Sequence, residues 1–180
     1  MICAIGKLSR IPPLRWILEI YTWLFRGTPL LLQLFFVYYG LPFAGIRFPP
    51  EIAAYITFVI NYAAYFTEIF RAGIQSIDRG QYEAAKALGM NYKMTMRRII
   101  IPQAVKLILP PTGNEAINLI KDTALCSAIT LPDILRNTKS MVSSHASVEG
   151  YFIAALLYLA MTFVIINIFK YIEKRFAYYN

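Results

Sequence analysis

Residues 151–169 read YFIAALLYLAMTFVIINIF and contain no charged side chain. A helix needs about 20 mostly apolar residues to cross the hydrocarbon core of a bilayer. In lipid the backbone must satisfy its own hydrogen bonds, and a helix does so within one segment. The stretch is too long and too continuously apolar for the alternating strands of an outer-membrane barrel. It therefore predicts a transmembrane helix.

Three further stretches long enough to span a bilayer indicate that this helix is one of several. One of them is interrupted by the sequence RGTP at Arg26–Pro29, and another is unusually polar. Residues 1–180 are thus expected to form a single all-α transmembrane domain, a polytopic helix bundle with four visible spans. The expected spans are about 20–40, 51–70, 107–131 and 151–169.

The composition of the whole chain agrees with a membrane protein. Of its 180 residues, 58% are hydrophobic and 16% charged, whereas soluble domains have about 45–50% and about 25%. A net charge of +8 is also typical of nucleic-acid binding. The basic residues fall mainly between the apolar segments, however, so we expect no nucleic-acid partner. Cys3, Cys126 and His145 form no metal-binding motif.

The distribution of lysine and arginine predicts the orientation in the membrane. Thirteen of these residues lie in the N-terminal flank, in the loop 71–106 and in the C-terminal tail, and only Arg47, Arg136 and Lys139 lie on the other side. Cytoplasmic loops carry the excess of positive residues. We therefore expect a multi-pass protein of the cell (inner) membrane, with the long loop and the C-terminus in the cytoplasm.

The basic loop carries the strongest local pattern. Residues 81–105 read QYEAAKALGMNYKMTMRRIIIPQAV. The run EAAKAL favours a helix, and Gly89 or Asn91 can end it in a left-handed cap. Residues 92–101 can form a second short helix, and Pro102 predicts a turn before the next span. Two interpretations fit: a docking element outside the membrane, or amphipathic helices lying on anionic lipid.

This loop, at about 73–105, resembles the EAA motif of the transmembrane permease subunits of ATP-binding cassette (ABC) importers. The family pattern is EAA, three residues, Gly, nine residues, and then I-x-L-P; isoleucine replaces the usual leucine at position 101. RGTP with the residues up to Gln33, and 113–123, resemble the polar amino-acid branch, so the resemblance covers nearly the whole chain. The matching residues of the motif are Glu83, Ala84, Ala85, Gly89, Ile99, Ile101 and Pro102.

The resemblance implies a type I importer fold and a defined set of partners. These are cytoplasmic ATPase subunits, a second permease subunit (a homodimer or a sister subunit), an extracytoplasmic substrate-binding protein and an amino-acid substrate. It implies that Glu83 pairs with basic residues of the ATPase and that Gly89 bends the coupling helices. ATP and Mg would bind the partner ATPase and no cofactor would bind this chain, which has no G-x-x-x-x-G-K-[ST] sequence. The chain by itself would not be an enzyme.

Family members of this branch carry a further span before the segment that resembles Lys7–Trp16. Residues 1–6 resemble the tail of that span, so the visible spans would follow the remnant of a first one. If this expectation holds, the complete subunit has five spans and an external N-terminus.

Polar residues inside the spans predict a substrate pathway, because ionisable groups in a membrane are costly and usually functional. Two helix faces, one on each of the second and third spans, are expected to line a cavity between paired subunits. Amide and hydroxyl groups would donate to a substrate carboxylate, and Glu68 or Glu115 would face a positive charge, which favours a basic amino acid. The pathway residues are Thr57, Asn61, Glu68, Asn114, Glu115, Asn118, Lys121, Asp122 and Thr123.

Other interpretations of these residues stay open. Lys121 and Asp122 can pair within the bundle, and the asparagines can link helices by hydrogen bonds. The RGTP sequence predicts a kink; it suits either a gating hinge or, as we favour, a helix that begins at Pro29. A self-contained secondary carrier or channel is the alternative function. A membrane enzyme is disfavoured, because no histidine cluster, nucleophile elbow or paired-carboxylate site is visible.

Overall fold

The computed structural model describes residues 2–9, 11–145 and 148–176. The regular elements of these residues are all helical, so the expected all-α fold is confirmed. The helices are α1 (Ile2–Leu8), α2 (Pro12–Gly27), α3 (Leu30–Phe35), η1 (Phe36–Gly40), η2 (Leu41–Ala44), α4 (Pro50–Gln75), α5 (Arg79–Ala87), α6 (Tyr92–Thr95), η3 (Met96–Ile100), α7 (Ile101–Asp122), η4 (Thr123–Ile129), α8 (Ile134–His145) and α9 (Glu149–Phe176).

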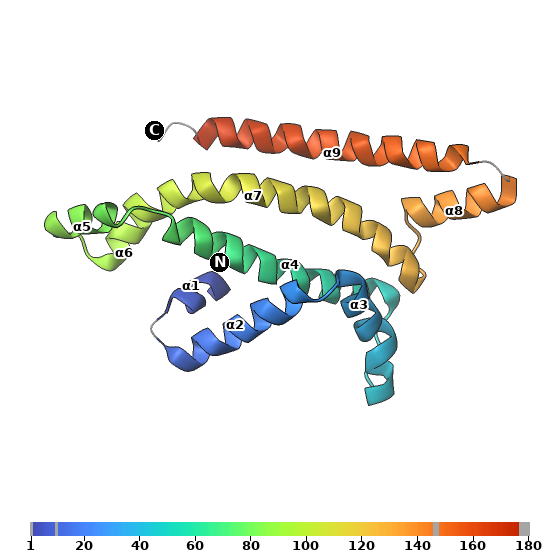
Figure 1. Cartoon of the computed structure of the whole chain (residues 1–180), viewed down its shortest axis with the longest axis horizontal. Helices are drawn as coiled ribbons and strands as arrows, with labels where there is room; N and C mark the ends of the chain where they lie inside the picture. Colours follow the sequence, from blue (N-terminus) through green and yellow to red (C-terminus); the bar gives the residue numbers. More distant parts are fainter. Residues whose placement is uncertain (1, 10, 146–147, 177–180) are drawn as a thin grey trace.

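The long helices α4, α7 and α9 form the body of the molecule (Figure 1). α7 packs against α4 on one side and α9 on the other, and α1 and α2 pack against α4 and against each other. The short helices α5 and α6 project from one end of this layer, whereas α3, η4 and α8 lie toward the other end (Figure 1). The loop 76–91 is therefore separated from the opposite end by the length of the long helices.

The helices differ in how well they suit a bilayer. α4 and α9 are each long and apolar enough to cross a membrane, and α2 meets that standard together with the segment 30–44. α7 does not, because its sequence includes the polar stretch TGNEAIN. In α9 only 6% of the most apolar window is buried within the chain, so most of this helix faces outward and suits lipid.

The first apolar segment is not one straight helix. α2 ends at Gly27, Thr28 and Pro29 are extended, and α3 begins at Leu30. The two parts meet at 103°. Proline lacks the N–H that a continuing helix needs, and its ring moves the preceding residue out of the helical region. The expected kink is thus confirmed, and a new helix begins directly after Pro29.

Two glycines let the long helices approach closely. A Cβ atom added to Gly73 of α4 would lie 2.4 Å from Cγ1 of Ile108 on α7. One added to Gly113 of α7 would lie 3.0 Å from Cγ of Phe169 on α9. Small residues at helix interfaces are the usual means of close packing in membranes. These contacts hold α4, α7 and α9 in register.

Candidate functional site: a charged cavity and a coupling loop

The loop between α4 and α7 consists of two short helices joined at a left-handed glycine. Asp78 is the N-cap of α5, and its Oδ1 accepts a hydrogen bond from the backbone N–H of Gly80. Gly89 has φ of +72°, which confirms the expected left-handed turn after α5. Asn91 does not share that conformation; its Oδ1 accepts from the N–H of Met94 at 2.9 Å, so it begins α6 instead.

The turn expected at Pro102 is absent, and that prediction was wrong. The chain is helical from Tyr92 to Asp122 through α6, η3 and α7, and Ile101 has helical angles of φ −60° and ψ −46°. η3 is a π-helical turn in which the N–H of Ile101 reaches the carbonyl of Met96. A π turn widens the helix by one residue, and this turn accommodates the proline ring without a break.

The EAA segment presents one polar face and buries the other. Ala85 is fully buried, whereas Glu83, Ala84 and Lys86 are exposed. Tyr82 packs against a core cluster that includes Ile74, Ile77 and Ile100 from the flanking helices, and this burial raises the pKa of the Tyr82 phenol. Ile99, Ile101 and Pro102 are half-buried. α5 is therefore fixed to the membrane helices while Glu83 stays available to a partner.

A cavity of about 410 Å³ lies where the break after α2 meets α4 and α7. Because residues predicted for the substrate pathway line it, we refer to it as the substrate cavity. Four of the predicted pathway residues line it: Asn61, Glu115, Asn118 and Asp122. The hydroxyl of Tyr62 donates to Oδ2 of Asp122 at 2.7 Å and so links α4 to the end of α7. The remaining lining residues are Arg26, Gly27, Thr28, Pro29, Leu30, Tyr62 and Tyr65.

The broken helix beside the cavity is held by two amide side chains. The Nε2 group of Gln33 donates to the carbonyl of Phe25 at 2.9 Å and to that of Thr28 at 3.1 Å. Nδ2 of Asn61 donates to the same Phe25 carbonyl at 2.9 Å and to Oε1 of Gln33 at 3.0 Å. A proline break frees backbone carbonyls, which need donors in lipid. The sequence prediction did not include Gln33 among the site residues. Its position one helical turn after Pro29 could have indicated it, because a polar side chain there can donate to the carbonyls that the break leaves free.

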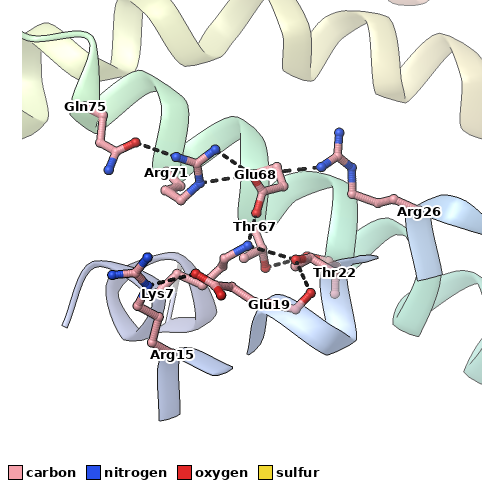
Figure 2. A network of polar contacts seen from close by, with 10 residues as sticks. Lys7, Arg15, Glu19, Thr22, Arg26, Thr67, Glu68, Arg71 and Gln75 are labelled. Atoms are coloured by element: carbon pink, nitrogen blue, oxygen red, sulfur yellow. Dashed lines mark hydrogen bonds and ion pairs between the residues drawn. The ribbon is translucent and has the colours of Figure 1, made fainter. Parts of the chain in front are cut away.

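Glu68 does not line the substrate cavity but forms the centre of an ion-pair cluster (Figure 2). Its carboxylate binds the ammonium of Lys7 on α1, and accepts from Nε and Nη2 of Arg71 at 2.9 and 2.7 Å. The Lys7 ammonium also donates to Oγ1 of Thr22 on α2 at 2.8 Å. The sequence prediction had placed Lys7 only among the topology-setting cations, because nothing local indicates a partner so distant along the chain.

The other predicted pathway residues lie away from the cavity. Thr57 is buried and donates to the carbonyl of Ala53 in its own helix. Thr123 donates in the same way to the carbonyl of Ile120. Asn114 and Lys121 are exposed on α7. Within the chain, the structure thus gathers only part of the predicted pathway into one cavity.

Comparisons with known proteins agree with this architecture. The family described as "Binding-protein-dependent transport system inner membrane component" matches residues 1–178. The probable amino-acid ABC transporter permease protein YckA of Bacillus subtilis is 38% identical over 177 residues, which cover 98% of this chain and 78% of that protein. The arginine transport system permease protein ArtQ of the same species is 40% identical, with coverage of 97% and 81%.

A solved structure is similar over the same extent. It is described as the crystal structure of an amino acid ABC transporter with histidines, and the superposition has a TM-score of 0.89. The sequences are 41% identical, and the match covers 97% of this chain and 82% of the other.

Proposed function

Because the chain belongs to the family of binding-protein-dependent transport system inner membrane components, we propose that it is the permease subunit of an ATP-driven importer of amino acids with basic side chains. The named relatives and the solved structure are amino-acid ABC transporters. Permeases of this kind work with an ATPase on a partner subunit and with a substrate-binding protein. The chain lacks a phosphate-binding loop motif of its own.

The observation that supports the basic substrate is the charge of the substrate cavity. It contains two carboxylates, of Glu115 and Asp122, and one guanidinium, of Arg26. An amino acid with a basic side chain carries two positive groups and one negative group. Opposite charges in the cavity attract such a substrate, and an unpaired charge within a membrane protein is costly. The cavity is therefore the electrostatic complement of such a substrate.

The same proposal gives the α5–α6 loop a docking role and sets the orientation of the chain in the membrane. The α5–α6 loop faces the cytoplasm and docks on the ATPase through Glu83, with Gly89 providing the bend; this is supported by the excess of lysine and arginine on that side and by the exposure of Glu83. Two permease subunits then pair, and alternating access moves substrate between them. A self-contained carrier or channel would need no such dock, and the family match disfavours it.

The proposal is tested by ATP-driven uptake into proteoliposomes that contain the permease, its ATPase and its binding protein. We expect L-arginine, L-lysine and L-histidine to accumulate in preference to L-glutamine and L-leucine. Glu115→Gln and Asp122→Asn should each reduce uptake of the basic amino acids about tenfold or more, as removal of one partner of a buried charge pair does. Glu51→Gln, which neutralises an exposed carboxylate outside the cavity, is the control. Preferred uptake of neutral amino acids would contradict the basic substrate class.

A further inference from the structure

Arg26 lies between two cavities. It belongs to the last turn of α2, directly before the break in the helix. It lines the substrate cavity and also a second cavity of about 430 Å³. Among the lining residues described for these two cavities, Arg26 is the one that they share. The second cavity is otherwise lined by Glu68, Ile69, Arg71, Ala72, Gly73, Ser76, Leu107 and Pro111.

The guanidinium of Arg26 is held in place without a hydrogen-bond acceptor. Its Cζ lies 5.5 Å from the ring centroid of Tyr65, a distance at which the aromatic face attracts a cation. Its nearest carboxylate oxygen, Oε2 of Glu68, is 3.9 Å from Nη1, which is too long for a hydrogen bond. In the part of the chain that the structure describes, none of the five N–H donors of this guanidinium has a hydrogen-bond acceptor. The side chain is 43% exposed.

Glu68 does not neutralise Arg26, because two other cations already occupy it. Lys7 and Arg71 both contact the Glu68 carboxylate directly, and their side chains are more buried than that of Arg26, at 10% and 31% exposed. Figure 2 shows Arg26 approaching Glu68 from the side opposite to Arg71, with Lys7 on a third side. Three cations thus surround one carboxylate. Two positive charges are therefore in excess, and of the three cations Arg26 is the one that also lines the substrate cavity.

We propose that Arg26 binds the α-carboxylate of the amino-acid substrate. A guanidinium offers two parallel N–H donors that match the two oxygens of a carboxylate. Each charged group of the substrate then has an opposite charge in the cavity: Arg26 binds the carboxylate, and Glu115 and Asp122 bind the positive groups. This inference rests on the proposed function and adds a specific consequence. The site selects amino acids over amines and amides that lack the negative charge.

The test is equilibrium binding to the permease–ATPase complex in nanodiscs without the binding protein, so that only the permease recognises the ligand. The radiolabelled ligand is whichever of L-arginine, L-lysine, L-histidine and L-glutamine the wild-type transporter accumulates fastest, and its α-carboxamide is the competitor. Arg26→Gln should weaken binding of the amino acid about 10- to 100-fold, the range for a lost charge-assisted pair, and should remove its preference over the amide. Arg26→Lys should keep the preference in reduced form.

Arg15→Gln is the matched control, because Arg15 lies on the same helix but pairs with Glu19 at the surface. Wild-type binding and preference are expected for it. The inference is overturned if Arg26→Gln binds as the wild type does, or if amino acid and amide lose affinity equally, which would indicate a structural role. If the wild-type transporter accumulates none of the four amino acids, the proposed function fails as well. If it accumulates one of them and Arg26→Gln leaves its preference over the amide unchanged, only the role of Arg26 fails.

Discussion

At the scale of single residues, Glu68 determines how the N-terminal helix is held. It is one side chain of α4, only 13% exposed, and it binds cations from α1 and from its own helix. A carboxylate at this depth is stable only while it is paired. The ion pair with Lys7 therefore ties α1 to the bundle and, through Thr22, to α2. The structure thus places Glu68 in contacts between helices, and its role in substrate recognition stays a prediction.

Replacement of Glu68 should accordingly affect stability. Glu68→Gln leaves Lys7 and Arg71 without their counter-charge, and removal of one partner of a buried pair costs about 3–5 kcal/mol. We expect a clear decrease in the melting temperature of the detergent-solubilised permease, followed by size-exclusion chromatography of heated samples. Glu19→Gln is the matched control, since the pair of Glu19 with Arg15 is solvent-exposed and such surface pairs contribute little to stability. Equal melting temperatures for the two variants would contradict this role.

At the scale of elements, the contact between α4 and α7 depends on the absence of a side chain at Gly73. Ile108 of α7 occupies the space that a methyl group would need. The core cluster of Ile74, Ile77, Ile100 and Ala104 continues this contact toward the loop. Tyr82 of α5 packs against the same cluster, so the loop and the ends of α4 and α7 form one packed unit.

A methyl group at Gly73 should separate these helices. Gly73→Ala is expected to destabilise the permease by about 1–3 kcal/mol, the range for overpacking a filled interface. Ile108→Ala removes the obstructing side chain, so the double variant should be more stable than the sum of the two single effects predicts. Thermal unfolding of the four proteins measures this coupling. If the two changes in unfolding free energy are simply additive, the role of Gly73 in the close approach of α4 and α7 is contradicted.

At the scale of the whole molecule, the coupling loop and the substrate cavity lie in separate parts of the fold. α5 and α6 are at one end of the long helices (Figure 1), and the cavity is set beside the break after α2. The family to which the chain belongs couples such a permease to a partner ATPase. Under the proposed function, α4 and α7 are the helices that connect the two sites, and alternating access requires that this packed element have two stable arrangements.

Changes in the loop should uncouple transport without unfolding the spans. In the reconstituted complex, Glu83→Ala removes the exposed carboxylate, and Gly89→Asp places a side chain where φ is +72°. Each should lower ATP-driven uptake about tenfold or more, as loss of an interface hot spot does, while the melting temperature of the membrane domain changes little. Glu51→Ala, an exposed glutamate in the first turn of α4, is the control. Unchanged assembly and uptake in both loop variants would favour a self-contained carrier.

The sequence by itself determined the helical class, the position of the main apolar segments, the break at Pro29 and the left-handed turn at Gly89. Each of these follows from the chemistry of neighbouring residues: apolar side chains in lipid, a missing N–H in proline and a missing Cβ in glycine. The turn predicted at Pro102 was wrong. The proline rule assumes a steric conflict with the preceding turn of a regular α-helix, and the π turn before Pro102 relieves that conflict.

Only the tertiary structure decided which polar residues meet. Lys7 and Glu68 form an ion pair, and Arg26 and Asp122 line one cavity, although the members of each pair are distant in sequence. No pattern in the neighbouring residues predicts that they meet. Helical periodicity placed Asn61 and Glu68 on one face of α4, but the break after α2 lies beside Asn61, whereas α1 lies beside Glu68. Side-chain surroundings depend on how helices pack, and that packing depends on contacts such as Gly73 with Ile108 that join distant parts of the chain.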